Sequence, residues 1–141
     1  MLTLRDYWMG RDSQYPTAMT PQIETNARRM VDLVNKLLAK LLAAGIHVPI
    51  SPGEGSQLSS GWRPAVVNSK TVGAAPNSKH MTGEAADIYD PEGEVDDWLM
   101  TDAGQQALIE VGLWMEHPSA TKGWAHVQSM PPRSGKRVFY P

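Results

Sequence analysis

The chain has 141 residues, of which 41% are hydrophobic and 20% are charged, and its formal net charge is −2. A chain of this length and apolar content is predicted to fold as one soluble domain with its own core. The slightly acidic balance argues against a general nucleic-acid-binding protein, which would present a basic face. Cysteine is absent, which excludes disulfides, a thiolate nucleophile and a cysteine zinc site. Any metal would therefore be bound by histidine, aspartate or glutamate.

The first residues, MLTLRDYWMGRDSQYP, lack the apolar segment that a signal peptide needs. The longest apolar stretch, LLAKLLAAGI, contains Lys40 and is too short to span a bilayer. We therefore expect a protein that is made in the cytoplasm and does not insert into a membrane. If it acts outside the cytoplasm, something else must release it.

Helical signals dominate the first third of the chain. Residues 1–19 mix polar and aromatic side chains and are predicted to form an arm packed on the domain. Thr20 and Pro21 are typical of a helix start, because a hydroxyl cap is followed by proline at the first helical position. Apolar residues then recur at helical spacing as far as Gly45, which predicts one long amphipathic helix over residues 20–45.

The pattern then changes to short alternating segments. Residues 46–130 are predicted to form the functional core, and residues 131–141 a C-terminal tail. A short strand is predicted within residues 46–50, and a second one leads to Gly61. A short helix is predicted to begin at Pro64.

The second half of this core is predicted to contain a strand, a helix and a hairpin. GEAADIYD alternates as a strand, and the acidic run DPEGEVDD is interpreted as a solvated turn leading into a helix. A further helix is predicted from a cap at Thr101 to Gly112, and LWMEH is predicted to pair with WAHVQ as a hairpin. Short strands mixed with helices in this order predict an α+β fold.

Three side chains are candidate metal ligands. His80 is placed on a loop, Asp87 on the strand that follows it, and His126 on a neighbouring strand, so the three can converge on one ion. Zinc is satisfied by such nitrogen and oxygen ligands, and catalytic zinc sites use three protein ligands.

Three segments that carry these residues, SGWRPAVVN, SKHMTGEAADI and GWAHVQ, resemble the zinc D-alanyl-D-alanine carboxypeptidase and endopeptidase family. This family belongs to a wider group that includes lysostaphin-type peptidases and the hedgehog domain. The resemblance covers about residues 59–128, and the two ends of the chain also resemble small phage-encoded members. The family's middle motif matches at every defined position, namely Ser78, His80, Gly83, Ala85 and Asp87.

The resemblance implies a single domain with a small antiparallel sheet flanked by helices. It implies that His80, Asp87 and His126 bind one Zn²⁺. It also implies that Arg63 holds or polarises the substrate, which suits the fixed fork of a guanidinium, and that Ser78 donates or accepts a hydrogen bond at the site.

The sequence departs from the family at the general base. Many members carry a glutamate three residues before the last histidine, and Gly123 occupies that position here. If the hairpin forms, Glu116 lies on the same face as His126, one diagonal away, and becomes the candidate base. His117 is the second candidate and Glu84 the third.

The sequence thus predicts a zinc metallopeptidase that hydrolyses peptide bonds in peptidoglycan stems or cross-bridges, with Trp124 as a floor of the substrate cleft. Both the D-Ala-D-Ala carboxypeptidase type and the L-Ala-D-Glu endopeptidase type stay open. The missing export signal favours an endolysin-like phage enzyme or a virion-associated one. The alternative is a non-catalytic wall-binding or virion structural module of the same fold, which Gly123 favours. We expect a monomer without a nucleic-acid partner.

Overall fold

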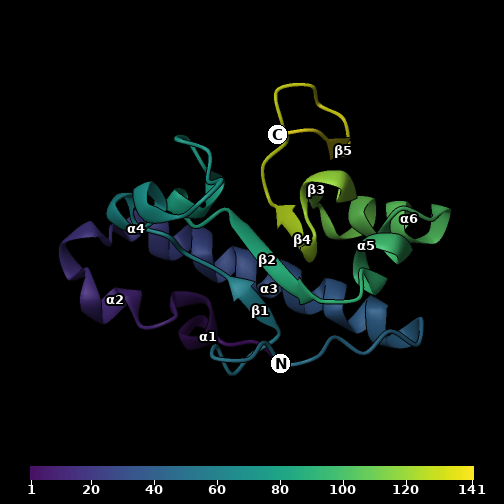
Figure 1. The fold of residues 1–141 in the computed structure, drawn as a ribbon, viewed down its shortest axis with the longest axis horizontal. Helices are drawn as coiled ribbons and strands as arrows, with labels where there is room; N and C mark the ends of the chain where they lie inside the picture. Colours follow the sequence, from purple (N-terminus) through teal and green to yellow (C-terminus); the bar gives the residue numbers. More distant parts are fainter.

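The computed structural model describes all residues from Met1 to Pro141 and has the predicted α+β architecture (Figure 1). The helices are α1 (Leu4–Trp8), α2 (Arg11–Gln14), α3 (Pro21–Ala43), α4 (Ala65–Lys70), α5 (Glu94–Leu99) and α6 (Asp102–Val111). The strands are β1 (Leu58–Ser60), β2 (Ala85–Asp90), β3 (Trp114–Glu116), β4 (Gly123–Gln128) and β5 (Val138–Phe139). Short 3-10 turns are η1 (Pro16–Ala18), η2 (Lys79–Thr82) and η3 (Pro118–Ala120).

The strands form one sheet in the order β1-β2-β4-β3-β5. Neighbouring strands are antiparallel except at the β3–β5 edge, which is parallel. The long helix α3 runs behind the sheet, and α5 and α6 lie beside its β3 end (Figure 1). The predicted small antiparallel sheet flanked by helices is therefore confirmed, with one parallel strand added at its edge.

Helix α3 forms where its caps predict it. The Thr20 hydroxyl accepts a hydrogen bond from the Ile23 amide at 3.1 Å. After Ala43 the amides of Gly45 and Ile46 bond back to the carbonyls of Leu42 and Leu41, and Gly45 has φ +84°. This is the Schellman ending, in which a positive φ favours glycine.

One stripe of α3 forms the back of the core, and it consists of Ala27, Met30, Leu33, Val34, Leu37 and Leu41. Leu37 and Leu41 are completely buried. The burial of each such side chain contributes roughly 1.5–3 kcal/mol to folding. The helix is therefore fixed to the sheet by packing along its length.

The strand predicted within residues 46–50 is wrong. This segment has no strand structure, although Ile46 and Val48 pack against the core. Its alternation reflects that packing, and Pro49 cannot donate to a strand ladder.

The acidic run after β2 does lead into a helix, but it is only partly solvated. The Asp90 carboxylate accepts the amides of Val95 and Asp96 at 3.0 and 2.9 Å, which caps α5. Asp90 and Asp96 are both buried. None of the helices is both long and apolar enough to cross a lipid bilayer.

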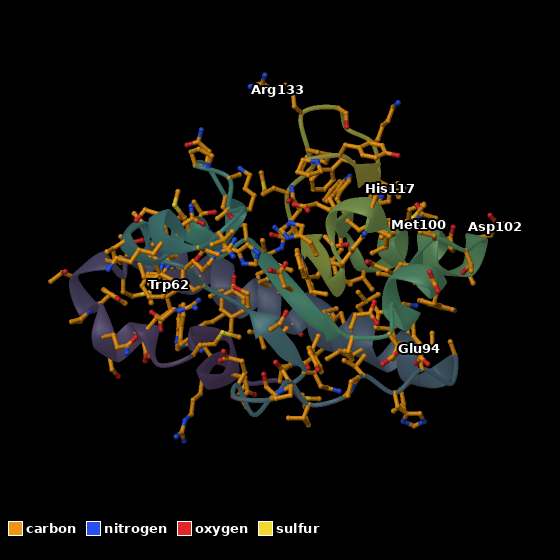
Figure 2. The ribbon with its side chains drawn as sticks, viewed as in Figure 1. Trp62, Glu94, Met100, Asp102, His117 and Arg133 are labelled. Atoms are coloured by element: carbon orange, nitrogen blue, oxygen red, sulfur yellow. The ribbon has the colours of Figure 1, made fainter.

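The N-terminal residues are part of the core. Thr3 and Asp6 form a capping box at α1, and Tyr7 and Trp8 are buried. The Tyr7 hydroxyl donates to the Ala85 carbonyl at 2.6 Å, which joins α1 to β2. Trp62, labelled in Figure 2, packs edge-on against Trp8, with the two ring centroids 5.5 Å apart.

Candidate metal centre and cleft

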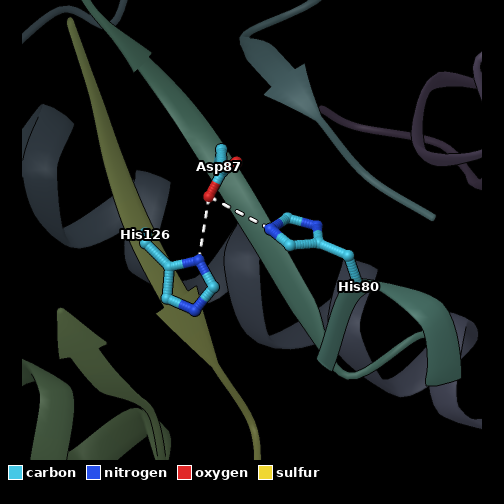
Figure 3. Close-up of side chains that lie close together, drawn as sticks. All are labelled: His80, Asp87 and His126. Carbon is cyan, nitrogen blue, oxygen red and sulfur yellow. Dashed lines mark hydrogen bonds and ion pairs between the residues drawn. The ribbon is translucent and has the colours of Figure 1, made fainter. Parts of the chain in front are cut away.

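The two innermost strands bring the candidate ligands together. Asp87 on β2 is the register partner of His126 on β4, and His80 comes from η2, just before β2. Figure 3 shows both imidazoles directed at one oxygen of Asp87. Oδ1 of Asp87 lies 2.9 Å from Nδ1 of His126 and 3.2 Å from Nε2 of His80.

Each imidazole is oriented by a second contact. Nδ1 of His80 lies 2.7 Å from the Gly61 carbonyl, an acceptor, so this nitrogen carries the proton and Nε2 is left with a free lone pair. Nε2 of His126 lies 3.0 Å from Oε1 of Gln128, whose amide nitrogen donates to the Met130 carbonyl. This contact leaves Nδ1 of His126 directed at Asp87. Such partners fix the tautomer of a metal-binding histidine.

The charges of this group are strongly coupled. Burial acts to raise the pKa of Asp87, but the nearby His80 and the hydrogen bond from His126 outweigh it and hold that pKa well below its usual range. Burial acts to lower the pKa of His126, but the hydrogen bond and charge of Asp87 outweigh it and raise that pKa. The carboxylate is therefore ionised, as a metal ligand must be.

The donor set fits a metal ion. One nitrogen or oxygen from each of His80, Asp87 and His126 lies within 4.8 Å of the others. All three side chains are buried, and Nε2 of His80 has no hydrogen-bond partner; its contact to Asp87 at 3.2 Å is an ion-pair contact only if the ring is protonated. A buried nitrogen without a partner is costly unless something binds it. Two imidazoles and one carboxylate match the ligands of zinc.

Local turns explain the spacing of the middle motif. The Ser78 hydroxyl accepts the His80 amide at 3.2 Å and one guanidinium N–H of Arg63 at 3.2 Å. Gly83 has φ +78°, and a Cβ there would lie 2.9 Å from the Ile23 carbonyl of α3. Serine therefore starts the turn, and glycine lets it close against the long helix before β2 begins.

The three base candidates lie in different places. Glu116 lines the cleft with its Oε1 3.8 Å from Nε2 of His126. His117 does not line the cleft: its Nδ1 lies 2.9 Å from the Ser119 hydroxyl and its ring is stacked on Tyr140. Glu84 accepts the hydroxyl of its neighbour Thr82 on the exposed side of η2.

One detail of the hairpin differs from the expectation. Because Met115 pairs with Val127, Glu116 lies opposite His126 and not one diagonal away. Gly123 has φ +103°, a conformation that strains any other residue. The backbone thus disfavours a glutamate at position 123.

The centre opens into a cleft of about 310 Å³. Arg63, Ser78 and Lys79 line it from the β1 side, and Trp124 on β4 lines it beside the centre. Phe139, from the predicted tail, lines it from the β5 side. Arg63 has a buried Nε without a hydrogen-bond partner, so its guanidinium retains a free donor.

The peptidase M15 family model matches residues 21–126 of the chain. The protein belongs to this family. Searches of curated proteins and of solved structures found no significant match. Membership in the family supports a zinc metallopeptidase and agrees with the His80, Asp87 and His126 group.

Three contributors to this site have no clear signal in the sequence. Gln128 follows His126 by two positions on β4, but its contact with that histidine depends on side-chain geometry. The Gly61 carbonyl that orients His80 is backbone and has no sequence signal. Phe139 lies in a two-residue strand, too short to show a period of alternation.

Proposed function

We propose that this M15 protein is a zinc-dependent peptidase that hydrolyses peptide bonds in bacterial peptidoglycan. The observation that carries the proposal is a carboxylate in the same cleft as the ligand group: Oε1 of Glu116 lies 3.8 Å from Nε2 of His126, the ring nitrogen opposite the proposed ligand Nδ1, and both residues line the cleft. A binding module would not need a carboxylate at that point. Hydrolysis needs one, because the attacking water must lose a proton.

The ligands would be Nε2 of His80, Oδ1 of Asp87 and Nδ1 of His126. When bound, zinc supplies a Lewis acid that polarises the scissile carbonyl and makes water more acidic. Glu116 accepts the proton of the attacking water and later delivers it to the leaving amine. Gln128 and the Gly61 carbonyl keep the two imidazoles in the required tautomers.

The walls of the cleft provide binding groups for a peptide. Arg63 lines the cleft with a positive guanidinium that suits a carbonyl or carboxylate of the substrate, and the Ser78 hydroxyl accepts one of its N–H groups and holds it in place. Trp124 presents an aromatic face beside the centre. Stem and cross-bridge peptides contain both carboxylates and small aliphatic side chains, which suits such a cleft.

The place of action is a further part of the proposal. We propose that the protein acts at the bacterial cell wall, as an endolysin-like phage enzyme after release or as a virion-associated one. The second candidate function is a zinc-containing module that binds the wall without cleaving it. Gly123, at the position of the usual base, is the observation that favours it.

Metal content and wall cleavage, measured on the same preparation, test the proposal. The purified chain is assayed for bound zinc and for new amino groups released from purified peptidoglycan, with and without a chelator. We expect one zinc per chain and release that the chelator abolishes and added zinc restores. Zinc without release, on several wall types and over a range of pH, would support the binding module instead.

A further inference from the structure

Strand β5 adds a wall to the cleft that lies outside the family match, which ends at residue 126. The His117 amide donates to the Phe139 carbonyl at 2.8 Å, and the Met115 amide donates to the Arg137 carbonyl at 2.9 Å. Val138, between them, packs against the core. β5 lies beside β3 in Figure 1. The segment is thus fixed by backbone pairing and by burial.

Phe139 is the side chain that this strand presents to the centre. Its ring meets the His126 ring edge to face, with centroids 6.2 Å apart and planes at 86°. The ring is half-buried and lines the same cleft as the ligands. The phenyl ring favours an apolar part of a ligand. A polar group of the ligand placed against the ring would lose its hydrogen bonds to water, and the ring offers none in return.

The two edges of the cleft differ in charge. Arg63 and Lys79 line it from the β1 and η2 side. At the opposite edge, Glu116 and Phe139 are register partners on β3 and β5. An anionic group of a substrate is attracted to the first edge and repelled by the carboxylate at the second.

We propose that Phe139 is a specificity-determining residue whose ring binds the uncharged aliphatic side chain of the residue that leaves with the new amine. This inference rests on the proposed function, in which Glu116 delivers a proton to that amine. The leaving residue must then lie at the Glu116 edge, next to Phe139. The methyl side chain of alanine fits there, whereas an acidic side chain would lie against a phenyl ring and a carboxylate.

The test varies the residue after the scissile bond. Two parent peptides are used, one ending in D-Ala-D-Ala and one containing L-Ala-D-Glu. The parent that the zinc-loaded wild type cleaves is then made in three forms. The residue after the scissile bond is alanine in the first, glycine in the second and glutamate in the third. We expect the wild type to prefer alanine over glycine by about tenfold in kcat/KM, the lower end of what one methyl group contributes in an apolar pocket. Phe139→Ala should reduce this ratio to about twofold or less.

Two further variants keep the test decisive. Val138→Ala removes apolar atoms from the same strand on its core side, and it should leave the alanine-to-glycine ratio unchanged. Phe139→Thr removes the ring but retains strand propensity, and it replaces Phe139→Ala if that variant does not fold.

The outcomes separate this inference from the proposed function. A folded, zinc-binding Phe139 variant with an unchanged ratio would overturn the inference while leaving the peptidase intact. A wild type that prefers glutamate after the bond would also overturn it. A wild type that binds zinc but cleaves neither parent would remove the proposed function itself, and this inference with it.

Discussion

The centre of the cleft and its outer edge are built in different ways. Asp87 and His126 face each other within six consecutive register pairs of β2 and β4, in the middle of the sheet. Glu116 and Phe139 face each other in a pairing of two residues at the outer edge. The centre lies within the family match, and β5 lies beyond it. We infer that the centre and Glu116, which lie within the match, carry the shared chemistry, whereas Phe139 adapts the cleft to its substrate.

The largest effect is expected from breaking the centre. His80→Ala or His126→Ala removes one of three ligand atoms and should abolish stoichiometric zinc binding and reduce peptidase activity to background. Metal analysis after dialysis measures this. His117→Ala, at a half-buried histidine that does not line the cleft, is the matched control and should keep its zinc. Full zinc content in either ligand variant would refute the assignment.

The next effect is expected at the edge. Glu116→Gln should keep zinc and fold but reduce turnover by about 10²–10⁴-fold, the usual contribution of general acid–base catalysis. Adding Gly123→Glu should not restore activity, because φ +103° strains a glutamate there. Steady-state kinetics on a cleaved peptide decides the matter. Near-normal turnover in Glu116→Gln would refute Glu116 as the general base.

A smaller effect is expected from the group that orients His126. Gln128→Ala removes the contact to Nε2 of His126 and should weaken zinc binding by about 10–100-fold, as the loss of such partners commonly does. Competition with a chelator of known affinity measures the change. Gln57→Ala, at a glutamine outside the cleft, should leave the affinity unaltered. Equal affinities in the two variants would show that the tautomer needs no such support.

The smallest expected effect is on the pH dependence of folding stability, and it concerns Asp96. The Asp96 carboxyl accepts a hydrogen bond from the Thr121 hydroxyl at 2.8 Å and so holds the loop between β3 and β4. Burial raises the pKa of Asp96 to about 7, and its Oδ1 has no partner. The folded state thus retains a proton that the unfolded state has lost. Stability should therefore fall as pH rises from about 4 to about 7.

Asp96→Asn isolates this dependence, because the amide does not titrate. We expect a flatter plot of Tm against pH for the variant between about pH 4 and 8 in the metal-free protein. Parallel curves for variant and wild type would assign the dependence to other groups.

The same contrast explains what the sequence could predict. His80 and Asp87 lie seven positions apart in one motif, and capping signals predicted α3 and α6 closely. Glu116 was placed on the correct face, but its register depended on the loop between β3 and β4, whose η3 turn was not foreseen. A carbonyl such as that of Gly61 acts through backbone position alone. These features arise from contacts between distant segments, which local periodicity does not encode.

The packing of α1 has a practical consequence for protein production. A fragment trimmed to the family match, residues 21–126, would lose Tyr7, whose carbonyl accepts the Trp62 amide. It would also lose Arg11, which donates to the Trp62 carbonyl at 2.7 Å. Gly61 precedes Trp62 in the chain, and its carbonyl orients His80. Both hydrogen bonds that hold the Trp62 backbone to the N-terminal segment would then be lost. Such a fragment would expose apolar surface and aggregate, and its inactivity would say nothing about the chemistry of the intact chain.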